Sequence, residues 1–134
     1  MSEYVTDTHA LVWHLSKGPK LSEAAKTVFV QADAGWHRIF VPGIVLIELV
    51  YLIEKHRLDK SLFHRAAALL NTPGGSYAIA PLDVQVAQAF EDIDHTTVPD
   101  MPDRIIVATA KRMGLPLISR DRAISQVTLI NVIW

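Results

Sequence analysis

The stretch of sequence that decides the fold is Tyr4-Val5-Thr6-Asp7-Thr8-His9-Ala10-Leu11-Val12-Trp13. Its first part is rich in β-branched and aromatic residues, which predicts a short strand over residues 4–7. The residues after Asp7 predict a helix over residues 8–15, and an aspartate at this junction is a good N-cap. A strand that leads directly into a helix is typical of α/β proteins with a parallel sheet.

The rest of the chain continues this alternation of short apolar runs and longer helical patterns. Apolar residues at helical spacing predict further helices that begin near residues 21–23, 44, 60 and 100, and another helix that carries Val86, Ala87, Phe90 and Ile93 on one face. Short β-branched runs predict strands at residues 38–41, 77–80, 117–119 and 129–133. We therefore expect a single α/β domain over residues 1–134, with a central parallel sheet.

Composition narrows the classes of protein to consider. Half of the 134 residues are hydrophobic and a fifth are charged, which is typical of a globular domain. The chain has no cysteine, so disulfides, thiolate zinc sites and cysteine nucleophiles are excluded. A net charge of -1 argues against binding nucleic acid through the global field of the protein. The longest apolar run, at residues 44–53, is too short to span a bilayer and no signal peptide is visible, so we expect a cytoplasmic protein without membrane contact.

Several carboxylates fall where the loops of a parallel sheet form sites. Asp7 ends the first predicted strand, Asp121 follows the strand at 117–119, and Asp103 lies in the first turn of a helix. The carboxyl ends of parallel strands meet at one edge of the sheet, so these side chains should converge. Each of these aspartates also has a structural interpretation. Asp7 can cap a helix, as can the nearby Asp100. Asp103 can stabilise the positive end of its helix, and Asp121 can form ion pairs with its neighbouring arginines.

Glu48 is the most informative acid, because its helix is apolar on all sides and is expected to be buried. Its neighbours three and four residues away are apolar or tyrosine, so no local cation can pair with it. An unpaired buried carboxylate costs several kcal/mol or takes up a proton. Two interpretations stay open: Glu48 bonds to a tyrosine or a distant arginine, or it binds a metal ion.

Taken together, the acids would repel one another unless cations neutralise them. Oxygen ligands without cysteine or a histidine pair suit Mg²⁺ or Mn²⁺. The six histidines show no zinc-binding spacing. We therefore predict one acidic site that holds divalent metal, formed by Asp7, Glu48, Asp103 and Asp121.

The chain resembles PIN-domain proteins, and among them the toxin ribonucleases of the VapC type. The resemblance rests on the opening segment at residues 5–13, on Ile47-Glu48-Leu49, and on the run from Asp100 to Ala110. It continues through Leu117-Ile118-Ser119-Arg120-Asp121 to the closing strand, and so covers essentially the whole chain. Each motif is loose alone, but their order and spacing together are specific.

The resemblance implies a three-layer α/β/α sandwich and a metal-dependent endoribonuclease that uses one or two Mg²⁺ or Mn²⁺ ions. Asp7, Glu48, Asp103 and Asp121 match the family's four acids, and Asp100 matches an accessory acid found in some members. Ser119 matches a position where a hydroxyl is common, and we expect Ser119, Thr8, Arg104 and Arg120 to support the ligands or contact RNA. The resemblance also implies a protein antitoxin as partner and a homodimer.

Two other classes of protein remain open. A phosphatase that uses an aspartate nucleophile after its first strand needs a second aspartate two residues later, and His9 occupies that position. A non-catalytic PIN-like scaffold that binds RNA or protein would keep the fold, but it would not need the acids.

Overall fold

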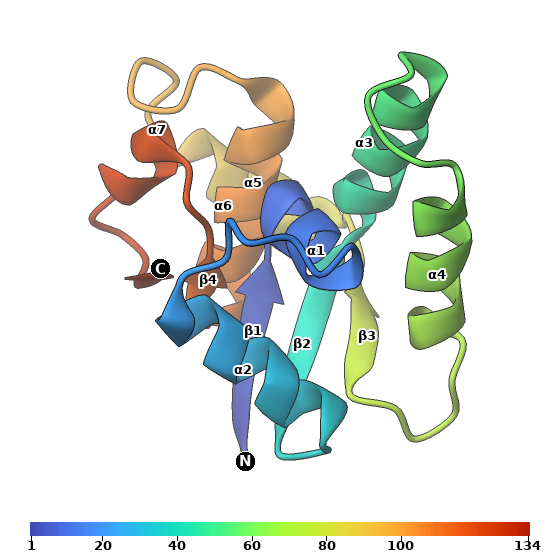
Figure 1. The fold of residues 1–134 in the computed structure, drawn as a ribbon. Coiled ribbons are helices and arrows are strands. Elements are labelled where there is room, and N and C mark those ends of the chain that lie inside the picture. The colour runs from blue at the N-terminus through green and yellow to red at the C-terminus, as the bar shows by residue number, and fades with distance from the viewer.

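The computed structural model describes residues 1–134, and its centre is a parallel sheet of five strands in the order β3-β2-β1-β4-β5. Figure 1 shows this sheet with its strands running from the N-terminus toward the edge where α1 begins. The strands are β1 (Ser2–Thr6), β2 (His37–Pro42), β3 (Tyr77–Ala80), β4 (Leu117–Ile118) and β5 (Val132–Ile133). The predicted parallel α/β fold is confirmed.

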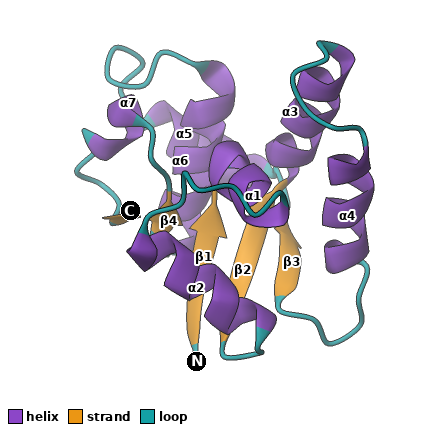
Figure 2. Ribbon diagram, viewed as in Figure 1, coloured by secondary structure: helices purple, strands orange, loops and turns teal.

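Seven helices connect the strands. They are α1 (Thr8–Leu15), α2 (Glu23–Asp33), α3 (Gly43–Glu54), α4 (Ser61–Leu70), α5 (Val84–Glu91), α6 (Met101–Met113) and α7 (Arg122–Ser125). Helices α1 and α2 lie on one face of the sheet and α5 and α6 on the other (Figures 1 and 2). Right-handed crossovers account for these faces, since the chain moves outward from β1 to β3 and then returns to β4.

This change of direction creates a switch point between β1 and β4. These two strands pair through Val5 with Leu117 and Thr6 with Ile118. The ladder continues as the backbone N–H of Asp7 donates to the carbonyl of Ile118 at 3.1 Å. Sites in open parallel sheets form outside the carboxyl ends of strands at such a point. Asp7 and Ser119 are the first residues after the two strands.

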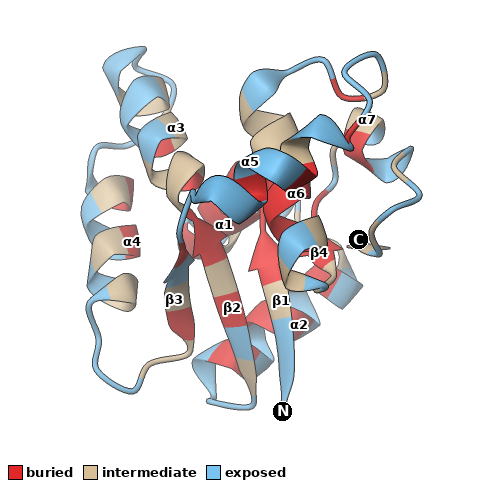
Figure 3. Ribbon diagram, turned by 180° about the vertical axis from the view of Figure 1, so that it is seen from behind, coloured by how far each residue is buried: buried red, intermediate tan, exposed pale blue.

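The core is a continuous cluster of apolar side chains on both faces of the sheet, with Val5, Ile39, Ile106 and Leu117 fully buried at its centre. Strands β1 and β2 become red toward their carboxyl ends in Figure 3, which marks burial. The buried hydroxyl of Thr6 donates a hydrogen bond to the carbonyl of the next residue, Asp7. Tight packing at this edge fixes the backbone from which the acids project.

The prediction that the helix carrying Glu48 is buried on all sides is wrong. Only Val45 and Leu49 of α3 are buried, whereas Ile47 and Tyr51 are 63% and 54% exposed. Figure 3 shows α3 mostly tan and pale blue. The reason is its position beyond the carboxyl ends of the strands, where it packs against α1, α4 and α6 on one side only. No helix of the structure combines the length and apolar character that crossing a membrane requires.

Two further boundaries differ from the sequence predictions. Helix α7 was not predicted, because its single turn is too short for a periodic pattern. The last strand is shorter than residues 129–133, since only Val132 and Ile133 pair with β4.

Candidate functional site

A pocket of about 350 Å³ opens at the switch point. We call it the acid pocket, and it is lined by Asp7, His9, Trp13, Glu48, Asp100, Asp103, Arg120 and Asp121. These residues come from the ends of β1 and β4 and from α1, α3 and the start of α6. The fold thus brings all five acids singled out in the sequence to one place.

Asp7 is buried at the floor of this pocket, and both of its carboxylate oxygens are engaged. Oδ1 accepts the backbone N–H of Ala10 at 2.9 Å, so Asp7 is the N-cap of α1. Oδ2 accepts the hydroxyl of Ser119 at 2.5 Å, which joins the ends of β1 and β4. Burial raises the pKa of Asp7, while these two hydrogen bonds oppose that shift.

Asp121 and Asp100 also cap helices, each with one oxygen. Asp121 Oδ1 accepts the backbone N–H of Ile124 at 2.9 Å, and Asp100 Oδ1 accepts that of Asp103 at 3.0 Å. The alternative that Asp121 pairs with a neighbouring arginine is wrong, since the ion pairs of the structure are His14–Asp33 and Lys111–Asp92. The second oxygens of both aspartates accept no hydrogen bond from the protein and stay available to a ligand.

Glu48 is half-buried and accepts the hydroxyl of Thr8 on Oε1 at 2.5 Å. Neither a tyrosine nor an arginine bonds to it, so that alternative from the sequence is wrong. Burial raises the pKa of Glu48, and the negative charge of Asp100 adds to this, while the Thr8 hydrogen bond lowers it. The sequence argument that Glu48 lacks a cation holds in three dimensions.

Asp103 carries the strongest sign of charge crowding. Its carboxylate accepts no hydrogen bond from the protein. Burial, together with the charges of Asp100, Asp121, Glu48 and Asp7, raises its pKa to about 7. The five acids therefore share one negative potential that the protein does not balance.

Two basic residues predicted to serve the site behave differently. Arg120 is exposed and lines the acid pocket. Arg104 turns away: its guanidinium donates to the carbonyls of Ile93 and Phe90, at 2.8 and 2.9 Å, and stacks 3.9 Å over the Phe90 ring. It fastens the end of α5 to α6 and does not line the acid pocket in this structure.

Two residues of the acid pocket were not in the predicted set. They are His9 and Trp13, which were not predicted as ligands or RNA contacts. Their spacing of four residues was the available signal, because such residues lie on one face of a helix. That face follows directly from Asp7, the N-cap.

The side chains fit a hard divalent cation by donor type. They offer carboxylate oxygens, two hydroxyls nearby and a single histidine, which suits Mg²⁺ or Mn²⁺ rather than zinc. In the conformation of the structure, no three of them converge closely enough to ligate one ion. Asp7 and Glu48 are instead turned toward Ser119 and Thr8. Ligation would require these carboxylates to rotate or to share oxygens already hydrogen-bonded.

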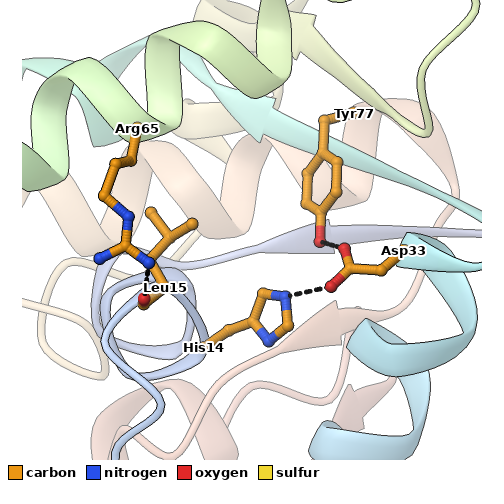
Figure 4. Close-up of polar contacts among 5 residues, drawn as sticks. All are labelled: His14, Leu15, Asp33, Arg65 and Tyr77. Atoms are coloured by element: carbon orange, nitrogen blue, oxygen red, sulfur yellow. Dashed lines mark hydrogen bonds and ion pairs between the residues drawn. The ribbon is translucent and has the colours of Figure 1, made fainter.

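A second, larger depression of about 1240 Å³ lies between α1, α2, α4 and the start of β3, and we call it the groove. Figure 4 shows the polar contacts beneath it: Asp33 accepts the hydroxyl of Tyr77 at 2.7 Å and contacts the His14 ring at 2.9 Å. Arg65 of α4 donates to the carbonyl of Leu15. These contacts tie α1, α2, α4 and β3 together.

The profile of the PIN domain matches residues 4–129. A curated relative, the ribonuclease VapC22 of Mycobacterium tuberculosis, is 27% identical over 127 residues, which cover 91% of this chain and 89% of the relative. The resemblance seen in the sequence is therefore confirmed.

Solved structures share the fold along their whole length. VapBC2 from Rickettsia felis, bound to a DNA fragment from its promoter, superposes with a TM-score of 0.72 at 15% identity, covering 98% of this chain and 97% of the other. DNA-bound VapBC from Salmonella typhimurium gives 0.68 at 19% identity, with coverages of 99% and 98%. A toxin–antitoxin complex from Klebsiella pneumoniae gives 0.65 at 22% identity, with coverages of 98% and 96%. At these identities the likeness concerns the fold.

Proposed function

The chain belongs to the PIN-domain family, and from this premise we propose that it is a metal-dependent endoribonuclease that hydrolyses RNA phosphodiester bonds. The observation that carries the proposal is the acid pocket, where burial and four neighbouring carboxylates raise the pKa of Asp103 to about 7 and the only basic side chains are Arg120 and His9. A stable fold does not need such repulsion, so a ligand that relieves it is the simplest explanation. We expect the protein to act in the cytoplasm, where its RNA substrate would be met.

In this proposal Asp7, Glu48, Asp103 and Asp121 hold one or two Mg²⁺ or Mn²⁺ ions, with Asp100 as an accessory ligand. A bound divalent cation supplies activation of water and neutralisation of the negative charge on the scissile phosphate. Asp103 would lose its proton on loading, because its raised pKa leaves it partly protonated near neutral pH.

The other polar residues would position these acids and the substrate. The Ser119 hydroxyl bonds Asp7 and also accepts the backbone N–H of Asp121 at 3.1 Å, so one side chain orients two acids. The Thr8 hydroxyl would orient Glu48 through its hydrogen bond to Oε1. Arg120, exposed at the pocket, would attract a phosphate that the acids alone repel.

We further propose that the protein is the toxin of a type II toxin–antitoxin pair, inhibited by a cognate antitoxin protein. The VapC22 ribonuclease supports this by sequence, and the Klebsiella pneumoniae structure is of a toxin–antitoxin complex. The exposed apolar side chains of α3, Ile47, Val50 and Tyr51, support a homodimer. Sedimentation as a monomer at micromolar concentration would count against that dimer.

The experiment that tests the activity is incubation of the purified protein with structured RNAs in Mg²⁺ or Mn²⁺, with and without chelator, followed by mapping of the cuts. We expect metal-dependent cleavage that disappears with chelator and with Asp7→Asn. Asp33→Asn in the groove is a matched control, since it removes the charge of an aspartate outside the acid pocket. If a folded protein cleaves no RNA with either metal, the alternative of a non-catalytic PIN-like scaffold that binds RNA or protein takes its place.

A further inference from the structure

Trp13 is the one residue that lines both the acid pocket and the groove. Among the eight residues of the acid pocket it is also the only hydrophobic one. Its side chain is half-buried at the surface of α1, and its indole N–H makes no hydrogen bond within the protein. A ligand that extends from the acid pocket into the groove therefore passes this indole.

The surroundings of the indole are aromatic and basic. Trp134 meets it edge-on with ring centroids 5.7 Å apart, and the His9 ring lies at the same distance in a tilted arrangement. The Lys20 ammonium is 5.6 Å from the ring centroid and the Arg120 guanidinium 5.9 Å. Both cations are on exposed, flexible side chains, so a phosphate can draw them from the ring without disturbing the core.

The charge becomes less negative across Trp13. On one side lie the five carboxylates of the acid pocket. On the other side the groove carries Lys17, Lys26 and Arg65 together with Glu23 and Asp33, and Lys20 lies beside the indole. A polyanion that places one phosphate among the acids needs cations for the phosphates next to it. An aromatic ring flanked by mobile cations is also the arrangement that binds single-stranded nucleic acid through stacking and backbone contacts.

We propose that Trp13 is a stacking platform for a nucleobase of single-stranded RNA, adjacent to the phosphate that enters the acid pocket. Lys20 and Arg120 contact the flanking phosphates. This inference rests on the proposed function for its substrate class, and it adds a substrate-binding residue on α1. It also implies that the RNA is unpaired where it is cut, because a base must leave its helix to stack on the indole.

The test measures binding of a 12-nucleotide oligoadenylate by the Asp103→Asn protein in chelator, where cleavage is prevented and one acid of the pocket is neutral. We expect Trp13→Ala to weaken binding about 10- to 100-fold, the usual effect of losing one stacked base. Trp13→Phe keeps an aromatic face and should stay within roughly threefold of the parent. Trp36→Ala is the matched control: Trp36 is 70% exposed just before β2, at the opposite edge of the sheet, and its loss should leave binding unchanged.

An abasic 12-mer separates stacking from charge. Its binding should be insensitive to Trp13→Ala and should weaken with Lys20→Ala or Arg120→Ala. Indole fluorescence gives an independent readout, since oligoadenylate should quench the parent and the Trp36→Phe protein more strongly than the Trp13→Phe protein, which keeps only Trp134 near the stacked base.

Two outcomes would overturn the inference. One is equal oligoadenylate affinity of the parent and a folded Trp13→Ala protein, and the other is an equal loss for abasic and base-containing strands. Because no cleavage is needed, the result is separable from the proposed function. Trp13-dependent binding by a protein that never cuts RNA would remove the nuclease proposal and keep the stacking site.

Discussion

Asp33 in the groove and Asp103 in the acid pocket are both aspartates of helices on the same molecule, and Trp13 lies between their two depressions. Asp33 accepts the Tyr77 hydroxyl at 2.7 Å and pairs with His14 at 2.9 Å, and the His14 ring is itself stacked on Phe29 with centroids 4.5 Å apart (Figure 4). Asp103 accepts no hydrogen bond and lies among four other carboxylates.

The difference separates two uses of a carboxylate. Around Asp33 each oxygen has a partner from another element, so the group joins α2 to α1 and β3. Burial and the nearby Asp33 together raise the pKa of Tyr77, which keeps its hydroxyl as a donor. Around Asp103 the like charges disfavour ionisation in the folded state, and no side chain of the protein forms an ion pair with this carboxylate. The contacts of the first cluster are structural, and we propose a ligand-binding role for the second.

The largest expected effect concerns activity. Asp103→Asn should lower RNA cleavage by about 1000-fold or more, since it removes a group that acts together with the other acids. Asp33→Asn should leave cleavage within roughly twofold, because it acts on stability only. Rates are measured with one RNA under saturating Mg²⁺. Equal losses of cleavage rate in Asp103→Asn and Asp33→Asn would contradict the different roles given to the two aspartates.

The next effect is stabilisation by metal. At a concentration 100 times its dissociation constant, Mn²⁺ should stabilise the protein by about 2.7 kcal/mol through binding to the folded state alone. Thermal unfolding with and without Mn²⁺ should show a rise of several degrees in the parent and in Asp33→Asn. Asp103→Asn should show little or none. Stabilisation by Mn²⁺ that is lost in Asp33→Asn and kept in Asp103→Asn would contradict the assignment of the acid pocket as the metal site.

A smaller effect is expected at the groove. Asp33→Ala should reduce the free energy of unfolding by about 1–2 kcal/mol, since it leaves the Tyr77 hydroxyl without its acceptor and His14 without its ion pair. Asp33→Asn should lose less, because its amide oxygen still accepts one hydrogen bond. Urea titration measures both, and a more stable Asp33→Ala protein would contradict the structural role.

The smallest effect has the opposite sign. In chelator at pH 8, Asp103→Asn should be more stable than the parent by about 1 kcal/mol, a value reduced for solvent screening of a half-buried group. The folded protein raises the pKa of Asp103 from 3.8 to about 7, so it binds more protons than the unfolded chain between these values. The parent therefore loses stability as pH rises through this window, and the variant lacks that loss. At pH 4 the two should be alike, and a less stable variant at pH 8 would show that Asp103 is held by contacts rather than strained by charge.

The order of strands and helices, and the meeting of the acids at one edge of the sheet, could be predicted from the sequence because they depend on local patterns. The strand before Asp7 and the helix after it follow from residues that are neighbours in the chain. Parallel topology then brings Asp7 and Asp121 to one edge, and the structure places them there. The assignment of these acids as ligands remains a prediction, as does the number of ions.

The remaining features depend on packing that no local pattern contains. The apolar helix α3 extends past the sheet and exposes Ile47, which only its position in three dimensions explains. Arg104 follows Asp103 in sequence, but on a helix adjacent residues point in different directions, and its guanidinium reaches α5. The position of Trp13 in the acid pocket was not predicted for a related reason, because it depends on which face of α1 lies toward the acids.

The most direct test of the central claim is calorimetric titration of Mn²⁺ into the purified protein at pH 7, repeated in two buffers with different heats of ionisation. The account predicts saturable binding with release of a fraction of a proton, because Asp103 is partly protonated near its pKa of about 7 and must ionise to ligate. Asp103→Asn should bind far more weakly and release no proton, while Asp33→Asn should match the parent. Absence of saturable binding by the folded parent, or binding that Asp103→Asn leaves intact, would contradict the assignment of the acid pocket as a metal site.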